Sequence, residues 1–518
     1  MARYKDYNYS QGKFIPIHFE RQILPGTFEY SLHYLIDNEI DLSVFDLRYR
    51  NDDTGAPAYD PAILLKIILY AYSRGITSSR EIAQSCRDNV IFMALSADTQ
   101  PHFTTISDFI STLKEEMIGL FLEVLMICDE MNLIGKEMFA VDGCKLPSNA
   151  SKEWSGTKGE LKKKKEKMEK SIRQIVKRHG EEDEREAERG VVKQEEQYID
   201  TLKKKVKKIK AWLKENEDKP GKSGKPIKSN ITDNESAKMK TTHGVIQGYD
   251  GVAVVDAKHQ IIVHAEAFGA GQEHELLLPM IEGTRENFEA IGNRRDVFEK
   301  AKLTADSGFH TEANMKEVMT QGIDAYIADT QFRKRDPRFS DADKYKERFK
   351  QDRADYYGTA ADLYRPSRDF TMSEDKTHCI CPGGKRLYRN GGNVVVKGNR
   401  AIKFHGRLTD CRVCELRKKC LRNPDRTEAR QVYFFQGRSD KKAETFTEKM
   451  KRKIDSIKGR LVYNRRLGTA EPVFGNICST LGLDRFTLRG KQKVNIQWML
   501  YCVVHNLLKV HRYGPELA

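Results

Sequence analysis

The sequence of 518 residues contains no apolar run near the roughly 18 residues that a membrane-spanning helix requires. Its most apolar stretch, residues 121–128, is interrupted by Glu123 and followed by Asp129 and Glu130. The first residues lead into polar sequence and lack the apolar segment of a secretory signal peptide. These absences argue against a membrane or secreted protein, and we expect a cytoplasmic one.

Cysteine is scarce, with 10 residues in the chain, so we expect reduced thiols or metal ligands rather than a disulfide framework. Apolar residues make up 39 %, which is enough for a sizeable core and excludes a wholly disordered chain. Charge is abundant, with 90 Lys+Arg against 75 Asp+Glu and a net charge of +15. Such a basic chain favours a polyanionic partner, most commonly nucleic acid, but charge alone distinguishes neither DNA from RNA nor binding from catalysis.

Residues 1–135 are predicted to form a helical domain. Pro61 suits the first turn of one helix, and a longer helix is expected over residues 104–131. Arg80 and Arg87 lie on short helices joined by tight turns, as in a helix-turn-helix DNA-binding domain. A plain helical bundle explains the pattern equally well.

Residues 152–228 form a very highly charged segment. Two stripes of apolar residues at four-three spacing, within 168–175 and 202–213, predict a two-helix hairpin. Its lysine runs, 162–165 and 203–205, indicate either an arm that binds phosphates or a solvated helix surface. The sequence favours neither interpretation.

Apolar strands alternating with helices are predicted on both sides of this hairpin, in residues 136–151 and 229–330. Residues 331–450 are expected to be an irregular, cysteine-containing insertion, and residues 451–518 return to helix. The fold class is therefore α/β, with a core interrupted by insertions and an N-terminal all-helical domain.

Two of the predicted strands end in an aspartate that a glycine follows closely, Asp142 and Asp306. Carboxylates at neighbouring strand ends repel each other, and Mg²⁺ is the usual ion between them. Glu471, just before Pro472 in the predicted first turn of a helix, is the candidate third acid. Spacing alone supports the trio weakly, because strand-end acids such as Asp256 are common here and more often belong to turns or caps.

Three segments carry a family resemblance. Residues 139–143 (FAVDG), 303–310 (LTADSGFH) and 463–477 (YNRRLGTAEPVFGNI) resemble the three signature regions of bacterial insertion-sequence DDE transposases, in the expected order. The most similar subgroup carries a Tyr-Arg-Glu-Lys signature around its glutamate. Residues 59–110 are similar to the helical N-terminal domain of the same enzymes.

The resemblance implies an RNase H-like core, a mixed sheet with flanking helices, in which Asp142, Asp306 and Glu471 bind two Mg²⁺ or Mn²⁺ ions. It implies cleavage at the ends of an insertion sequence and joining of the 3′-hydroxyl to target DNA. The expected partners are double-stranded DNA, as terminal inverted repeats and target, and a second copy of the chain. Tyr463 and Arg466 are expected to contact the DNA end, in a bacterial protein associated with the nucleoid.

The chain departs from that signature at Cys478, where the family has lysine. Lys491 and Lys493 are the candidates to replace it as DNA contacts. One alternative is therefore a catalytically impaired or domesticated relative that binds DNA ends without cutting them. Another is a zinc-containing nucleic-acid scaffold whose acids are incidental.

Five cysteines lie close together in the predicted insertion. Cys411 and Cys414 have the spacing of a zinc half-site, and Cys381 begins a CPGG segment typical of a zinc knuckle. With Cys420 they make a candidate tetrahedral site for structural Zn²⁺, which leaves Cys379 spare. Free thiols in an irregular insertion are an equally good explanation.

Overall fold

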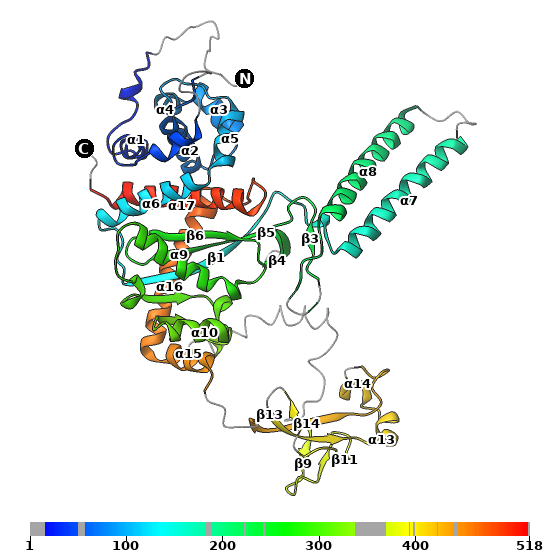
Figure 1. Cartoon of the computed structure of the whole chain (residues 1–518). Coiled ribbons are helices and arrows are strands. Elements are labelled where there is room, and N and C mark those ends of the chain that lie inside the picture. Colours follow the sequence, from blue (N-terminus) through cyan, green and yellow to red (C-terminus); the bar gives the residue numbers. More distant parts are fainter. Residues whose placement is uncertain are drawn as a thin grey trace, which may run out of the picture. The chain divides into compact units, whose positions relative to one another are not determined.

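The computed structural model (Figure 1) describes residues 16–49, 57–182, 189–221, 224, 226–241, 244–336, 369–392, 394–396, 399–421, 423–438 and 444–515. The chain forms two compact units, the first made of Met1–Asp329 with Met450–Ala518 and the second of Thr330–Lys449. Among the helices in these ranges, none combines the length and apolarity needed to cross a bilayer.

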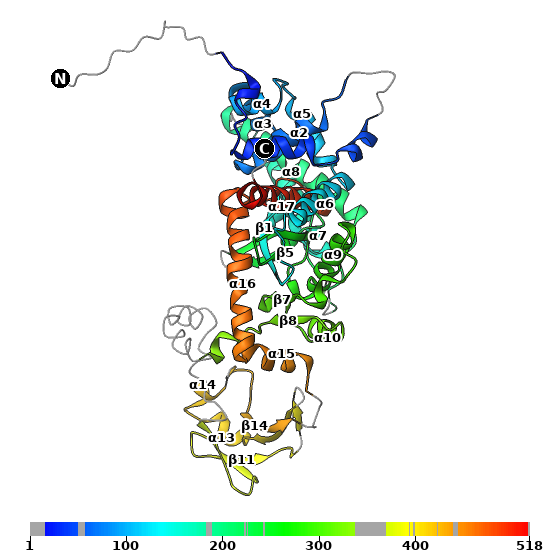
Figure 2. The same cartoon turned by 90° about the vertical axis from the view of Figure 1, so that its left-hand side faces the viewer.

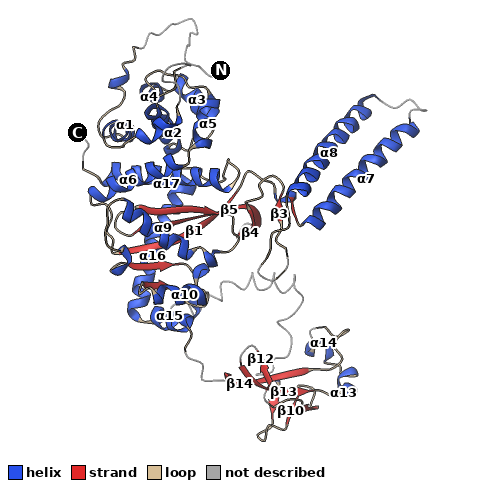
Figure 3. Cartoon of the chain, in the orientation of Figure 1, coloured by secondary structure: helices blue, strands red, loops and turns tan. Residues whose placement is uncertain are grey.

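A mixed six-stranded sheet organises the first unit. Its strands are β1 (Met138–Pro147), β4 (Ala237–Thr241), β5 (Gly244–Asp256), β6 (Ile262–Phe268), β7 (Lys302–Ala305) and β8 (Asp324–Ile327). The central strand β1 pairs antiparallel with β5 and parallel with β7, and β8 continues parallel to β7. Strands β4 and β6 both pair antiparallel with β5. Figure 3 draws the strands in red and the surrounding helices in blue. The strands are rich in buried Val, Ile and Ala because helices cover the sheet.

Four helices pack on this sheet. They are α9 (Leu277–Ala290), α10 (Glu312–Thr320), α16 (Ile457–Gly475) and α17 (Lys491–Tyr513). Helix α16 contacts β1, β5, β7 and β8, and Figure 2 shows it running alongside the sheet. Asn506 of α17 binds both the N–H and the carbonyl of Ile262, at 2.9 and 2.8 Å, so this side chain replaces a neighbouring strand at the start of β6.

The N-terminal helices belong to the same unit. They are α1 (Phe28–Asn38), α2 (Pro61–Ser73), α3 (Ser79–Asp88), α4 (Val90–Leu95), α5 (Phe103–Thr112) and α6 (Glu115–Glu130). Among them, α1, α2, α5 and α6 pack on α17. Asp60 caps α2 by accepting a hydrogen bond from the N–H of Ala62 at 2.8 Å, and Pro61 takes the first position, as predicted. The single helix predicted over 104–131 is wrong, because Lys114 adopts a non-helical conformation that separates α5 from α6.

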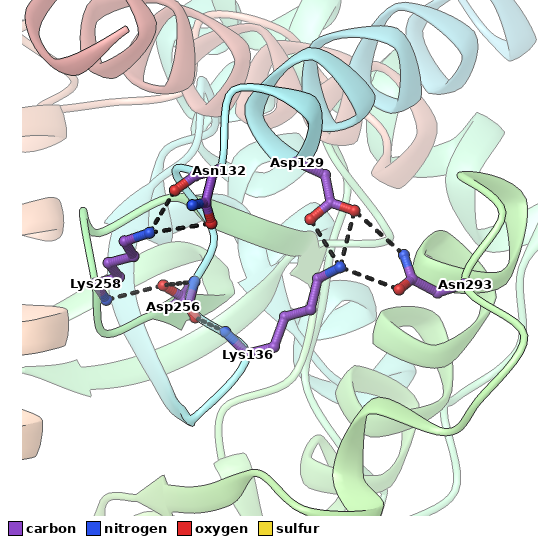
Figure 4. Close-up of polar contacts among 7 residues, drawn as sticks. Asp129, Asn132, Lys136, Asp256, Lys258 and Asn293 are labelled. Atoms are coloured by element: carbon purple, nitrogen blue, oxygen red, sulfur yellow. Dashed lines mark hydrogen bonds and ion pairs between the residues drawn. The ribbon is translucent and has the colours of Figure 1, made fainter.

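The turn between α6 and β1 is held by Asp256, which is fully buried (Figure 4). Its carboxylate accepts hydrogen bonds of 2.8–2.9 Å from the backbone N–H groups of Gly135, Lys136 and Lys258. The ammonium of Lys136 binds Asp129 at 2.8 Å. Asp256 is therefore a structural acid, and it fixes the point at which β1 begins.

A two-helix hairpin is inserted between β1 and β5. It consists of α7 (Lys158–Glu182) and α8 (Arg189–Glu215), closed at the base by pairing of β2 (Ser155–Gly156) with β3 (Ser229–Asn230). Leu161, Ile209 and Trp212 form a buried apolar cluster at this base. The helices thus pair through apolar stripes, as their spacing predicts.

The second unit contains regular structure where the sequence predicted an irregular segment. Its antiparallel sheet has the strands β9 (Thr371–Met372), β10 (His378–Ile380), β11 (Arg386–Arg389), β12 (Val394–Val396), β13 (Asn399–His405) and β14 (Gln431–Arg438). Phe370, Leu387, Phe404 and Val432 are buried together in its core, and Cys379 is buried among them. The sequence analysis missed these strands because most of them are short, and because Arg or Lys residues alternate with apolar residues in several of them.

Candidate active site

Asp142 and Asp306 lie side by side in the central sheet. Val141 and Ala305 are partners in the parallel pairing of β1 with β7, and each aspartate is the next residue. Asp306 follows the end of β7, as predicted. The prediction that Asp142 ends its strand is wrong, because β1 continues to Pro147 through its pairing with β5.

The guanidinium of Arg466, on α16, lies between these two carboxylates. One nitrogen, Nη1, is 2.6 Å from Oδ2 of Asp142, and Nη2 is 4.0 Å from Oδ1 of Asp306. The Arg466 side chain is only 7 % exposed, and its charge stands over the ring of Tyr463 at 5.7 Å. Its Nε atom has no hydrogen-bond partner among the described residues.

Burial raises the pKa of the Asp142 carboxyl, and the positive charge of Arg466 lowers it in opposition. Asp306 adds a smaller effect that again raises the pKa, because its charge has the same sign. The backbone N–H of Gly143 donates a 2.9 Å hydrogen bond to Oδ1 of Asp142 and so helps to fix its orientation. Two acids and one cation thus form the polar centre of this face.

A second polar group, which the sequence analysis did not identify, lies next to the first. Lys145 of β1 binds Glu273 at 2.6 Å and is the strand partner of Asp250 on β5. Asp250 is fully buried, and burial together with the negative charge of Glu273 raises its pKa to about 7. Register alone brings Lys145 and Asp250 together, so no local pattern could have indicated them.

Glu273 also supports the loop that follows Asp306. A Cβ atom at Gly308 would lie 1.8 Å from Oε2 of Glu273, so any larger residue there would force the Glu273 carboxylate to move. His274 donates from Nδ1 to the carbonyl of Gly308 at 2.7 Å. The signal available in the sequence was Gly308 itself, within the segment that resembles the second signature region.

Glu471 lies on α16, five positions after Arg466, with an exposed side chain. It makes no hydrogen bond or ion pair with Asp142 or Asp306, and no three acidic, histidine or cysteine side chains in the described ranges are grouped closely enough to hold an ion. The structure therefore brings two of the three predicted acids together. Pro472 lies inside α16 and not in a first turn, which corrects the predicted helix start.

Cys478 lies on a π-helical turn, Asn476–Thr480, that follows α16. Its thiol hydrogen-bonds that of Cys144 on β1, and this bond lowers the pKa of Cys478. Lys491 binds Glu266 at 2.7 Å. Lys493 is exposed at the start of α17.

The N-terminal arginines are both exposed on α3. Arg80 stands over the ring of Phe103 at 5.1 Å and borders a groove that Ser79 and Ser107 also line. Arg87 lies in the last turn of the same helix. Both side chains are thus accessible to a ligand, as a DNA-contacting role requires.

The four cysteines proposed as zinc ligands line one cavity of about 30 Å³ in the second unit. Cys411 lies on α13 (Leu408–Arg412) and Cys420 ends α14 (Arg417–Cys420). Burial raises the pKa of Cys420 to about 11. The backbone N–H of Lys385 donates to the sulfur of Cys381 at 3.4 Å. The cavity offers these four thiols and the carboxylate of Asp410 to an ion, although they are not gathered into a preformed metal group in the described structure.

Two family models match the chain. The family described as "Transposase DDE domain" matches residues 380–511, which include the cysteine cavity, α16 and α17. The family described as "Transposase domain (DUF772)" matches residues 17–112, the N-terminal helices. Neither match extends over Asp142 or Asp306, and no curated protein matches the chain. Both families are transposase families, so the two matches indicate an insertion-sequence DDE transposase.

Proposed function

We propose that this transposase cleaves DNA at the ends of its insertion sequence and joins the released 3′-hydroxyl to target DNA. The observation that carries the proposal is the pair Asp142 and Asp306, adjacent in the sheet and compensated by the single charge of Arg466. Carboxylate oxygens in such a pair are the donors that Mg²⁺ or Mn²⁺ prefers.

An RNase H-like core is proposed for the sheet of the first unit. Its support is the strand order β6-β5-β1-β7-β8, in which β1, β7 and β8 are parallel and β5 and β6 are antiparallel neighbours. In that arrangement the two aspartates come from adjacent central strands and the glutamate from a helix packed on them. Helix α16 is packed in this way and carries Glu471.

Asp142, Asp306 and Glu471 would hold the divalent cations. When bound, these ions polarise the phosphodiester and make the attacking oxygen a better nucleophile. Arg466 donates to Oδ2 of Asp142 and neutralises this carboxylate; if a cation were held there, it would compete with the guanidinium, which could then bind a DNA phosphate. Tyr463, in contact with Arg466, is proposed to lie beside the same DNA end. Because the reaction joins two element ends to one target, a dimer is expected on DNA.

The test is cleavage of a plasmid that carries the ends of the element, with Mg²⁺ or EDTA. Asp142→Asn and Glu471→Gln should each abolish metal-dependent nicking while DNA binding is retained. The matched control is Glu289→Gln, which removes an exposed acid from α9 and should leave nicking unchanged. Nicking that survives both acid substitutions would refute the assignment.

The alternative is a relative that binds element ends without cutting them. Two observations favour it: Glu471 makes no contact with the aspartates, and Cys478 takes the place of the family lysine. Binding of the ends with no cutting under Mg²⁺ or Mn²⁺ would make this the correct function.

A structural Zn²⁺ is proposed for the second unit. Cys381, Cys411, Cys414 and Cys420 would hold it, because these four thiols line the same cavity whereas Cys379 packs in the core. Such an ion would connect α13 and α14 to the turn after β10. Metal analysis of the purified chain should give about one zinc per chain, with loss of the ion in Cys414→Ser and retention in Cys379→Ser.

A further inference from the structure

The hairpin of α7 and α8 carries its charge in two separate zones. The basic zone, residues 158–178 and 203–215, contains 17 Lys+Arg and 4 Asp+Glu, for a net charge of +13. In the sequence, the segment between these two stretches, residues 181–200, contains 3 Lys+Arg and 9 Asp+Glu, for a net charge of −6. A surface that only needed to be soluble would gain nothing from such segregation, because interspersed charges of both signs repel less.

Many exposed lysines of the basic zone have no acidic partner among the described residues. Lys210 binds Glu169 at 2.9 Å, and Lys158 pairs with Glu217 at the base. Eight exposed lysines make no ion pair within the described residues: Lys162, Lys163, Lys167, Lys170, Lys204, Lys207, Lys208 and Lys214. Four come from α7 and four from α8, so both helices offer unpaired positive charge.

The base of the hairpin is fixed to the catalytic sheet. Ser155 donates a 2.8 Å hydrogen bond to Gln247 of β5, and Asn230 donates one of 2.8 Å to the carbonyl of Ser151. Lys164 and Lys205, one from each helix, stand over the ring of Trp154 at 4.8 and 6.0 Å. The basic zone therefore begins at a defined place rather than on a loose linker.

That place lies near the candidate active site along the chain. The part of β1 from Asp142 to its end at Pro147 is about 17 Å long at the usual rise of a strand, and α7 begins 11 residues later, at Lys158. The basic part of α7 from Lys162 to Arg178 is about 24 Å long. Duplex DNA rises about 3.4 Å per base pair, so this length matches roughly seven base pairs.

We propose that the basic zone binds the phosphate backbone of duplex DNA over about seven base pairs, next to the segment held at the active site. The acidic segment, residues 181–200 in the sequence, does not belong to the proposed contact, because its negative charge repels phosphates. The identity of this duplex as transposition substrate rests on the proposed function. Binding of duplex DNA by the zone does not.

The test uses the full-length chain and a fluorescent 40-base-pair duplex of arbitrary sequence, titrated by anisotropy at several KCl concentrations. The hairpin variant replaces Lys162, Lys163, Lys204 and Lys207 by Gln. Each lost phosphate contact lowers the slope of log K against log salt by about 0.9, so the slope should fall by about 2–4. Replacing the same four residues by Arg should preserve the slope, since the charge remains.

A matched control removes four positive charges from exposed positions outside the hairpin. Its substitutions to Gln are at Arg294, Arg295, Lys300 and Lys316. The control should change the slope by less than one. Equal slopes for the hairpin variant and the wild type, or equal falls in hairpin variant and control, would overturn the proposal.

Two further readouts separate the outcomes. Sedimentation of the variants shows whether the hairpin instead joins two copies of the chain: loss of a dimer with an unchanged salt slope would overturn DNA binding by the zone. Metal-dependent cleavage by the wild type, combined with an unchanged slope in the hairpin variant, would refute this inference and leave the proposed function standing. A reduced salt slope in the hairpin variant, with no cleavage by the wild type or any variant, would support this inference and refute the proposed function.

Discussion

Removal of Arg466 should destabilise the first unit unless a second cation replaces it. The guanidinium is buried and only 2.6 Å from Asp142, with Asp306 at 4.0 Å, so Arg466→Met leaves two neighbouring carboxylates uncompensated. Loss of one partner from a buried ion pair typically costs about 3–5 kcal/mol. Because Asp142 can take up a proton, we expect about 3 kcal/mol at pH 7.5 in EDTA.

The double variant Arg466→Met with Asp142→Asn should recover most of this loss, because it removes the charge that Arg466 compensates. Added Mg²⁺ should stabilise Arg466→Met more than the wild type, since the ion no longer competes with the guanidinium. Both effects are expected because Arg466 and the ion would compete for the same carboxylate, that of Asp142.

Urea denaturation followed by tryptophan fluorescence is suited to the measurement. The three tryptophans of the chain, Trp154, Trp212 and Trp498, all belong to the first unit, so the second unit contributes no signal. A loss below 1 kcal/mol in Arg466→Met, or no recovery in the double variant, would refute the reasoning. Equal stabilisation of Arg466→Met and the wild type by Mg²⁺ would show that Arg466 does not compete with the ion.

Four further predictions follow from single residues. Gly308→Ala should displace the Glu273 carboxylate, lower cleavage at least tenfold and leave duplex binding unchanged, as cleavage and anisotropy assays would report. The pKa of Asp250 is raised to about 7, so its contribution to the free energy of unfolding is complete below pH 3.8 and is lost as the pH rises through 7. Asp250→Asn should abolish this loss of stability in urea titrations from pH 5 to 8 in EDTA. Asp256→Ala leaves three backbone N–H groups without their acceptor and should cost about 3 kcal/mol by tryptophan fluorescence, whatever the metal. Cys411→Ser should release zinc and make the second unit sensitive to protease, whereas zinc-free wild type with normal protease resistance would contradict the site.

Local sequence patterns predicted the elements that depend on local interactions. The capped start of α2 follows from Asp60 and Pro61, and the pairing of α7 with α8 follows from stripes that include Leu202 and Val206. The break at Lys114 was missed, because apolar residues continue on both sides of it with helical spacing. The family resemblance, confirmed by the two family matches, supplied the order of the signature segments.

Long-range register limited the prediction of the site. Asp142 and Asp306 were identified because both follow short apolar runs in the sequence, and the pairing of β1 with β7 brings them together. Lys145 and Asp250 were not, since they meet only through the pairing of β1 with β5. The role of Glu471 stays a prediction, because its carboxylate is not joined to the aspartates in this structure.

The insertion of the hairpin into the sheet has a consequence for folding. Phe139 of β1 pairs with Asp256 of β5, 117 positions later, so at 5–20 residues per second the ribosome needs about 6–23 s to supply the partner strand. The helices of the hairpin can form locally within microseconds, and the pairing of β2 with β3 then joins the two ends of the insertion. The loop that β1 and β5 must close is thereby shortened from over a hundred residues to a few tens, which lowers its entropic cost. A hairpin that folds early would make a long insertion in the centre of the sheet compatible with efficient folding.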